Sequence, residues 1–365
     1  MKVMFIDDNE ESVQDAMDEV SDNIGDVDLW IENFGQGLEN IEVKSPNIVV
    51  LDVWEGKAEE SDPLGLGIME LIWSRNFCPV IIYSADSKII SDIPEYDHPF
   101  IEIIAKGVGS DEKVREAVER FIPHVQALQS SQSLVSRAFS HAMRDVAPDA
   151  INTFSETGEF VDAVVRGGRR RVAALMDEAS PEVEALASWE QYLAPPVSQD
   201  IRLGDVLRSS QGDPDDPTAF RVVLTPSCDT VSTALKVESV LVAKCCKIGL
   251  ALHRCQIGLS ERSIKRSNIL TQGFYNVYVP FPKLPAKIPA MAADLRDLEL
   301  IPVGAIGVEG EEFLRVASVD SPFRELISWA YLQVAGRPGL PQRDLDGWIH
   351  DIIEAANTPS ESEAN

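Results

Sequence analysis

The strongest constraint on the fold is a rhythm in the first 124 residues, where short β-branched runs alternate with amphipathic stretches. Such alternation of strand and helix patterns is typical of an α/β domain built on a doubly wound parallel sheet. The middle run, NIVVLDVW, is apolar without alternation until Asp52, as expected of a strand that helices cover on both faces. The predicted strands are Lys2–Ile6, Asp28–Phe34, Asn47–Val53, Pro79–Ser84 and Ile101–Ala105, and the predicted helices between them are Glu11–Val20, Leu66–Arg75 and Glu112–Phe121.

The later part of the chain has a different texture. Residues 124–198 are rich in apolar residues at helical spacing and predict a helical connector after a first domain of residues 1–123. Residues 199–350 carry strand-like runs such as FRVVLTPSCD, VESVLVAKCC and FYNVYVPFP, followed by two helical patterns, which predicts a β-rich α+β domain. Residues 351–365 are expected to hold the end of a C-terminal helix and a disordered tail.

Charge is spread unevenly along the chain. The net formal charge is −28, and residues 1–124 hold 28 Asp and Glu against 9 Lys and Arg. Such a field repels a phosphate backbone, so we do not expect nucleic acid as a partner. The sequence also lacks a basic winged-helix or helix-turn-helix pattern in its second half.

The sequence favours the cytoplasm. The start, MKVMFIDDNE, does not have the layout of a signal peptide, and no stretch reaches the roughly 20 consecutive apolar residues that a membrane span needs. Five cysteines, an odd number, fit a reducing compartment better than a disulfide framework. We therefore expect a cytoplasmic protein without membrane insertion.

Polar residues follow the predicted parallel strands where each strand ends. Asp7 and Asp8 follow the first strand, Asp52 lies at the end of the third, and Lys106 follows the fifth. Because the carboxyl ends of parallel strands meet at one edge of the sheet, these side chains are expected to converge. Three carboxylates at one edge repel one another unless a cation lies among them, and Mg²⁺ prefers such oxygen ligands.

This set of residues suits phosphoryl chemistry. An aspartate carboxylate such as Asp52 can act as a nucleophile and form an aspartyl-phosphate. A metal ion, the ammonium of Lys106 and the hydroxyl of Ser84 would stabilise the charge that builds on the phosphoryl oxygens.

The motifs FIDDN, VVLDVW, IIYSAD and IAKG, in this order and spacing, resemble the response-regulator receiver family over residues 1–122. The resemblance implies a flavodoxin-like five-stranded parallel sheet, a cognate sensor histidine kinase as phosphoryl donor, and Mg²⁺ as cofactor. It implies no enzyme activity beyond magnesium-dependent self-phosphorylation. The residues it assigns are Asp52 as phosphoacceptor; Asp7, Asp8, Asp52 and the backbone carbonyl of Trp54 as Mg²⁺ ligands; and Ser84, Ala85 and Lys106 around the phosphate.

Three departures from that family concern how phosphorylation is read out. Gly107 stands where the family has proline, Ile103 replaces the common aromatic switch residue, and the loop Glu55–Gly65 is longer than usual. The signal is therefore expected to leave through that loop or through the helix after Lys106.

The second half resembles an uncharacterised output domain that accompanies receivers, through LTPSCD, FYNVYVPFP, DLRDL and RVASVDSPFRELISWAYLQVAGRPGLP. The similarity extends loosely to an accessory receiver protein of a Detocs-type phage-defence two-component system. It implies a non-DNA-binding domain that signals to a downstream protein effector.

Two other interpretations of the second half stay open. Cys228, Cys245, Cys246, His253 and Cys255 could supply thiolate and imidazole ligands to Zn²⁺, although there is no C-x-x-C pair and cysteines of this kind are often simply buried. Alternatively Cys228, beside Asp229, could be the nucleophile of a metal- or thiol-dependent enzyme gated by the receiver, with His253 as base.

A basic island of four arginines, Arg166 and Arg169–Arg171, is either a solvated or salt-bridged helix end or a docking site for the acidic first domain.

Overall fold

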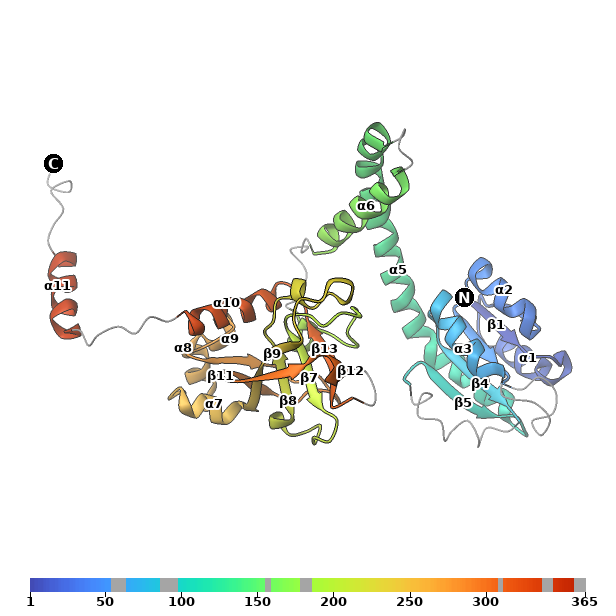
Figure 1. Ribbon diagram of the computed structural model, residues 1–365. Coiled ribbons are helices and arrows are strands. Elements are labelled where there is room, and N and C mark those ends of the chain that lie inside the picture. The colour runs from blue at the N-terminus through green and yellow to red at the C-terminus, as the bar shows by residue number, and fades with distance from the viewer. Residues whose placement is uncertain are drawn as a thin grey trace. The chain divides into compact units, whose positions relative to one another are not determined.

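The computed structural model describes residues 1–53, 64–85, 98–154, 159–177, 186–307, 311–336 and 344–357 (Figure 1). The chain divides into two compact units, residues 1–183 and residues 184–365. None of the described helices combines the length and the apolar character that a membrane crossing would need.

Unit 1 is built on a five-stranded parallel sheet with the strand order β2-β1-β3-β4-β5. This is the flavodoxin-like order of a doubly wound sheet, so the predicted fold class of the first domain is confirmed. The strands are β1 (Lys2–Ile6), β2 (Asp28–Glu32), β3 (Ile48–Leu51), β4 (Val80–Ser84) and β5 (Ile101–Ala105).

Helices cover both faces of this sheet, which explains why β1, β3 and β4 are apolar without alternation. One face packs against α1 (Gln14–Asn23) and the first turns of α5 (Ser110–Phe154), through side chains such as Val20 and Phe121. The other face packs against α2 (Phe34–Lys44) and α3 (Leu64–Arg75).

The α2 helix was not predicted, because Gly35 and Gly37 weaken the helical pattern of its first turn. Burial of Phe34 and Ile41 against β1 and β3 provides the stabilisation of the helix that its local sequence does not. Tertiary packing of an apolar face often outweighs weak helix propensity.

The helix after Lys106 does not end at Phe121. It continues as a single 45-residue helix through Pro123 and Pro148, and so runs across the predicted boundary between residues 123 and 124. A second helix, α6 (Phe160–Asp177), turns back along it (Figure 1). Gly167 and Gly168 of α6 lie against Val146 and Met143 of α5, which shows that small residues allow the two helices to approach closely.

Unit 2 holds an eight-stranded, largely antiparallel sheet with the order β10-β11-β9-β8-β7-β13-β12, in which β6 also pairs with β13. The predicted β-rich domain is therefore present. Its strands are β6 (Tyr192–Leu193), β7 (Asp205–Ser209), β8 (Phe220–Val223), β9 (Ser239–Lys247), β10 (Tyr278–Phe281), β11 (Met291–Pro302), β12 (Ile306–Gly307) and β13 (Phe313–Val319).

The helices of unit 2 are α7 (Ile248–Arg254), α8 (Glu261–Ser267), α9 (Ile269–Gln272), α10 (Phe323–Ala335) and α11 (Leu345–Asn357). The last two coincide with the two predicted helical patterns. The α10 helix covers one face of the sheet with the buried side chains of Ile327 and Ala330.

One buried ion pair ties the sheet of unit 2 to the segment before it. The Asp205 carboxylate accepts hydrogen bonds from the Arg315 guanidinium and from the Ser318 hydroxyl. The same guanidinium donates to the carbonyls of Ser198, Gln199 and Asp200. Nearly every N–H donor of Arg315 thus has an acceptor. A charged residue that is only 9% exposed needs such partners, because burial removes its contact with water.

Candidate functional site

The predicted acidic site forms at the carboxyl edge of the unit 1 sheet. Backbone hydrogen bonds carry the parallel ladder one residue past the strands: the Asp52 amide donates to the Ile6 carbonyl, and the Lys106 amide donates to the Ser84 carbonyl. Residues at the ends of β1, β3, β4 and β5 are therefore held side by side.

Lys106 lies between the two carboxylates that the sequence places at the ends of β1 and β3. Its ammonium donates to Asp7 Oδ2 and to Asp52 Oδ2, both at 2.6 Å. It also donates to the hydroxyl of Ser12 at 3.1 Å. The lysine side chain is 16% exposed, Asp52 is 11% exposed and Asp7 is 1% exposed, so the site is largely screened from solvent on one side.

The turn after β1 fixes the orientation of Asp7. Asp7 Oδ1 accepts from the backbone amide of Asn9, and Oδ2 accepts from the hydroxyl of Ser12. Asn9 in turn caps the short 3₁₀ helix Glu10–Ser12. Sequence reasoning missed Ser12, because its place five residues after Asp7 gives no signal until the turn is known.

The charges of the site are mutually dependent. Burial raises the pKa of Asp7, and the hydrogen bonds from Lys106 and the Asn9 amide offset this only in part. Burial by itself lowers the pKa of Lys106, but its hydrogen bonds to Asp52 and Asp7 outweigh burial and leave that pKa raised. Lys106 is therefore held as an ammonium, which is the form that can contact a phosphoryl oxygen.

Ser84 supplies a buried hydroxyl at the end of β4. Its side chain is fully buried, and its oxygen has no hydrogen-bond partner among the described residues. A buried polar group without a partner costs about 1–3 kcal/mol, and a catalytic or binding role is one explanation for such a group. A phosphoryl oxygen above Asp52 would give this hydroxyl an acceptor.

The other predicted site residues are Asp8, Ala85 and Trp54. Asp8 is exposed, as is Ala85 beside Ser84. Trp54 lies outside the described residues, as does nearly all of the loop Glu55–Gly65. Among the residues that the structure describes, no three His, Cys, Asp or Glu side chains are grouped as a metal site, because Lys106 stands between Asp7 and Asp52. Two convergent carboxylates still fit Mg²⁺, which binds proteins through one or two carboxylates and keeps several waters.

A buried aromatic contact links this site to α5. The ammonium of Lys106 lies over the ring of Tyr83, at 5.4 Å from its centroid. The Tyr83 hydroxyl is 2.7 Å from the hydroxyl of Ser110, the first residue of α5. The Ser110 hydroxyl also donates to the carbonyl of Gly107, which follows Lys106 directly and lies three residues before the start of α5. The sequence did not single out Tyr83, because the receiver family has its aromatic switch residue at the position that Ile103 occupies here.

No protein-family profile and no curated protein sequence matches this chain. Solved structures similar to part of it include a two-component transcriptional regulator AraC from Clostridium phytofermentans ISDg, with 20% identity, 36% of this chain and 98% of that chain covered, and a TM-score of 0.27. Another is the response regulator domain of Thermotoga maritima CheB, with 15% identity, coverage of 35% and 94%, and a TM-score of 0.26. RcsB from Salmonella enterica serovar Typhimurium, bound to promoter rprA, has 14% identity, coverage of 49% and 94%, and a TM-score of 0.27.

The structure does not assemble the predicted zinc ligands of unit 2. Cys245 and Cys246 are neighbours on β9 and so point to opposite faces of the sheet, and Cys245 is buried in the core. Burial raises the pKa of Cys245, which disfavours the thiolate that zinc requires. Cys228 is exposed, and its thiol lies near Asp229 rather than near another ligand. With Cys255 and His253 included, these side chains are not grouped as a metal site within the described part of the chain.

The arginine island lies on α6. Arg171 pairs with Asp145 of α5 at 2.6 Å, and Arg166, Arg169 and Arg170 are exposed. The island therefore serves at least partly to join the two helices of the hairpin.

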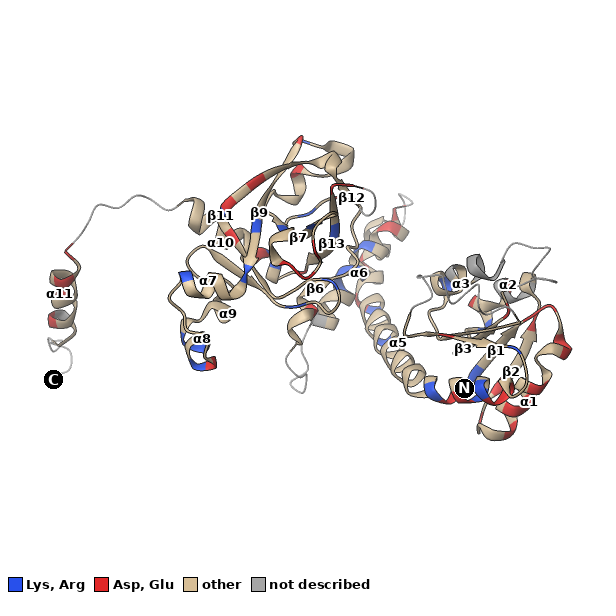
Figure 2. Cartoon of the chain, turned by 90° about the horizontal axis from the view of Figure 1, so that it is seen from below, with Lys and Arg blue, Asp and Glu red and all other residues tan. Residues whose placement is uncertain are grey.

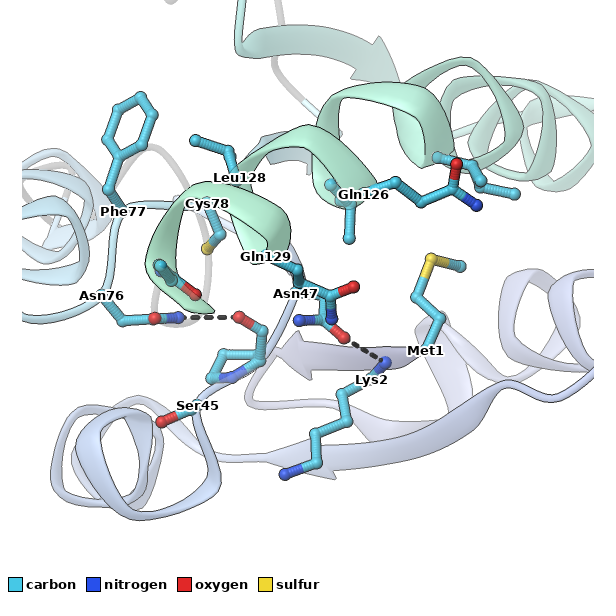
Figure 3. Close-up of a pocket in the computed structure, with 14 residues that line it drawn as sticks. Met1, Lys2, Ser45, Asn47, Asn76, Phe77, Cys78, Gln126, Leu128 and Gln129 are labelled. Carbon is cyan, nitrogen blue, oxygen red and sulfur yellow. Dashed lines mark hydrogen bonds between the residues drawn. The ribbon is translucent and has the colours of Figure 1, made fainter. Parts of the chain in front are cut away.

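A separate cavity of about 590 Å³ lies at the opposite, amino-terminal edge of the unit 1 sheet (Figure 3). Its polar side chains are mostly amides: Asn76 donates to the carbonyl of Pro46, and Asn47 accepts from the amide of Lys2. The thiol of Cys78 also lines it, and burial raises the pKa of that thiol to about 12. Without carboxylates, this cavity does not contribute to the acidic site.

Proposed function

We propose that this protein is a two-component response regulator whose Asp52 accepts a phosphoryl group from a sensor histidine kinase. The observation that carries the proposal is that Asp7 and Asp52 converge on the ammonium of Lys106. The carbonyl of Ser84 accepts from the Lys106 amide, and its buried hydroxyl has no partner among the described residues. In the proposed reaction, Asp52 is the nucleophile, Lys106 the cation and Ser84 the hydroxyl donor.

The transfer is a displacement at phosphorus. An Asp52 carboxylate oxygen forms the new O–P bond, the P–N bond of the kinase phosphohistidine breaks, and the imidazole leaves with the electron pair. Lys106 exchanges its contact with Asp52 for a phosphoryl oxygen, and Ser84 donates its hydroxyl to another. Asp7, Asp8 and Asp52 would hold Mg²⁺, and the ion would supply positive charge to the phosphoryl oxygens.

The readout is proposed to run through α5. When Lys106 and Ser84 turn toward the phosphoryl group, they change the packing around Tyr83, which lies beneath Lys106 and next to Ser84 in the chain. The hydrogen bond from Tyr83 to Ser110 carries that change to the first turn of α5. This path would take the place of the aromatic switch residue, which Ile103 cannot provide.

Unit 2 is proposed to signal to a downstream protein, in the cytoplasm, without binding DNA. The acidic charge of the chain disfavours a nucleic-acid backbone as the partner of this unit. The resemblance of its motifs to an output domain of defence operons supports a place in a phage-defence system of the Detocs type.

Phosphorylation by acetyl phosphate with Mg²⁺ tests the proposal on the whole protein. We expect the intact mass to rise by one phosphoryl group, and the label to be released by hydroxylamine, as an acyl phosphate is. Asp52→Asn should remove the gain, whereas Asp28→Asn, which changes an exposed aspartate of β2, should retain it. The assignment of Asp52 as the phosphoacceptor is wrong if the parent protein takes no label, or if Asp52→Asn is labelled as well as its parent.

The readout has a separate test. Beryllofluoride with Mg²⁺ should change hydrogen exchange in residues 110–121 of the parent protein. In Tyr83→Phe, which keeps the ring and loses the hydroxyl, the same addition should leave that exchange unchanged while labelling of Asp52 persists.

A further inference from the structure

The last helix of unit 2 presents an apolar stripe to solvent. Leu345, Trp348, Ile349, Ile352 and Ile353 follow the spacing of one helix face, and each is between 51% and 58% exposed. Isolated helices of fewer than about 12–15 residues are marginal in water, and α11 has 13 residues. Packing of this apolar stripe against another surface would therefore stabilise the helix.

The polar side of α11 restricts what that surface can be. Residues 344–357 contain Asp344, Asp346, Asp351 and Glu354 but no Lys or Arg. An anionic lipid surface repels such a helix because both are negatively charged. The strongly acidic first 124 residues of the chain repel it for the same reason. The matching surface must be apolar at its centre and basic around it.

Unit 2 itself contains an apolar groove of about 480 Å³. It is lined by residues of α9, β10 and α10, including Leu270, Phe281, Phe323, Leu326 and Ile327. Leu270 at its mouth is 67% exposed. The apolar surface continues along α10 to Trp329, which is 48% exposed and whose ring packs against Phe274.

The segment that forms most of this groove is also the most basic part of unit 2. Residues 247–287 carry seven Lys and Arg and one acidic residue, Glu261, in a chain whose net charge is −28. Lys and Arg positions are prominent on α8 (Figure 2), which packs against α9. The seven are Lys247, Arg254, Arg262, Lys265, Arg266, Lys283 and Lys287.

The connection between α10 and α11 allows α11 to reach the groove. Nine residues separate Ala335 from Leu345 and can span about 30 Å when extended. The groove residue Phe323 lies twelve helical residues before Ala335, a distance of about 18 Å along α10. A tether this short gives the helix a high effective concentration at the groove.

We propose that α11 packs its apolar stripe into the α9–α10 groove of its own chain, with Trp348 as the central anchor and the acidic face of α11 toward the basic segment 247–287. Bound in this way, α11 occupies this apolar groove. A partner that presents a similar acidic amphipathic helix would have to displace it.

Hydrogen exchange of the full chain tests this docking with a matched pair of variants. Ile352→Asp places a charge in the stripe, and His350→Asp places the same charge on the exposed polar face. We expect Ile352→Asp to accelerate exchange in residues 269–281 and 323–332 by at least about fivefold, and His350→Asp to leave those rates unchanged. Equal rates in the two variants and the parent would overturn the proposal.

A charge exchange tests the orientation. Lys283→Glu with Lys287→Glu should accelerate exchange in the groove, and adding Asp351→Lys with Glu354→Lys to that variant should restore slow exchange. Light scattering decides which chain supplies the helix. A monomeric mass with protection that does not depend on protein concentration supports docking within one chain, whereas a dimer that Ile352→Asp dissociates would overturn it in favour of a second copy.

Discussion

Lys106→Met removes the ammonium that contacts both Asp7 and Asp52 while retaining most of the side-chain volume. The two contacts of 2.6 Å place the accepting oxygens no more than about 5 Å apart. Two unit charges at that separation repel by roughly 3 kcal/mol at an effective dielectric constant near 20. Removing one partner of a buried pair costs about 3–5 kcal/mol, and the partial exposure of Lys106 lowers this. We therefore expect unit 1 to lose about 2–4 kcal/mol of stability without divalent cations.

Native-state hydrogen exchange measures this loss in unit 1 alone, because peptides from β1 and β3 report on the opening of its core. A loss of about 3 kcal/mol corresponds to exchange that is faster by roughly two orders of magnitude. Lys113→Met is the matched control, since Lys113 is an exposed lysine of α5.

Two further measurements separate charge repulsion from a packing defect. Asp7→Asn in the Lys106→Met background should recover much of the stability, because it removes one of the two facing charges. Mg²⁺ should stabilise Lys106→Met more than it stabilises the parent, because the metal replaces the missing ammonium. The reasoning is refuted if β1 and β3 exchange less than about tenfold faster in Lys106→Met, or equally fast in Lys113→Met.

Three other predictions concern buried groups. Ser110→Ala removes the hydroxyl that bonds Tyr83, and should abolish the beryllofluoride-induced change in α5 exchange without abolishing labelling. Arg315→Met should destabilise unit 2 by about 3–5 kcal/mol in urea denaturation, because Asp205 is left buried without its cation. The double variant Arg315→Met with Asp205→Leu should recover part of that loss. An Arg315→Met variant as stable as the parent protein would contradict this reasoning. A thiol reagent at pH 8 should modify the exposed Cys228 in the native protein but modify Cys78 only after unfolding, since burial raises the pKa of that thiol to about 12; native labelling of Cys78 is the contrary result.

The sequence predicted the convergence of Asp7, Asp52 and Lys106 because these residues lie at strand ends. Once Lys2–Ile6 and Ile101–Ala105 are recognised as parallel strands, the sheet must bring Asp7 and Lys106 to one edge. Local patterns also located α10 and α11, whose apolar spacing is helical.

The sequence did not predict the features that depend on a partner distant in the chain. The α2 helix forms because Phe34 and Ile41 are buried, despite two glycines. The 45-residue length of α5 is supported by α6 packed along it, and local cues suggested a break near Pro123. β11 contains the polar stretch DLRDLEL, and its pairing with β9 makes it a strand.

Sequence by itself determined which side chains meet at the carboxyl edge of the sheet, because period-two and period-3.6 patterns fix the strands and strand ends fix the edge of the sheet. Tertiary structure alone decided how those side chains contact one another. It placed Lys106 between two carboxylates, left the hydroxyl of Ser84 without a partner among the described residues, and joined Tyr83 to Ser110. Within the described part of the chain, it did not group the cysteines and His253 of unit 2 as a metal site. The physical reason is that a hydrogen bond or a metal site needs ångström-level positions across the fold, and no local periodicity encodes those.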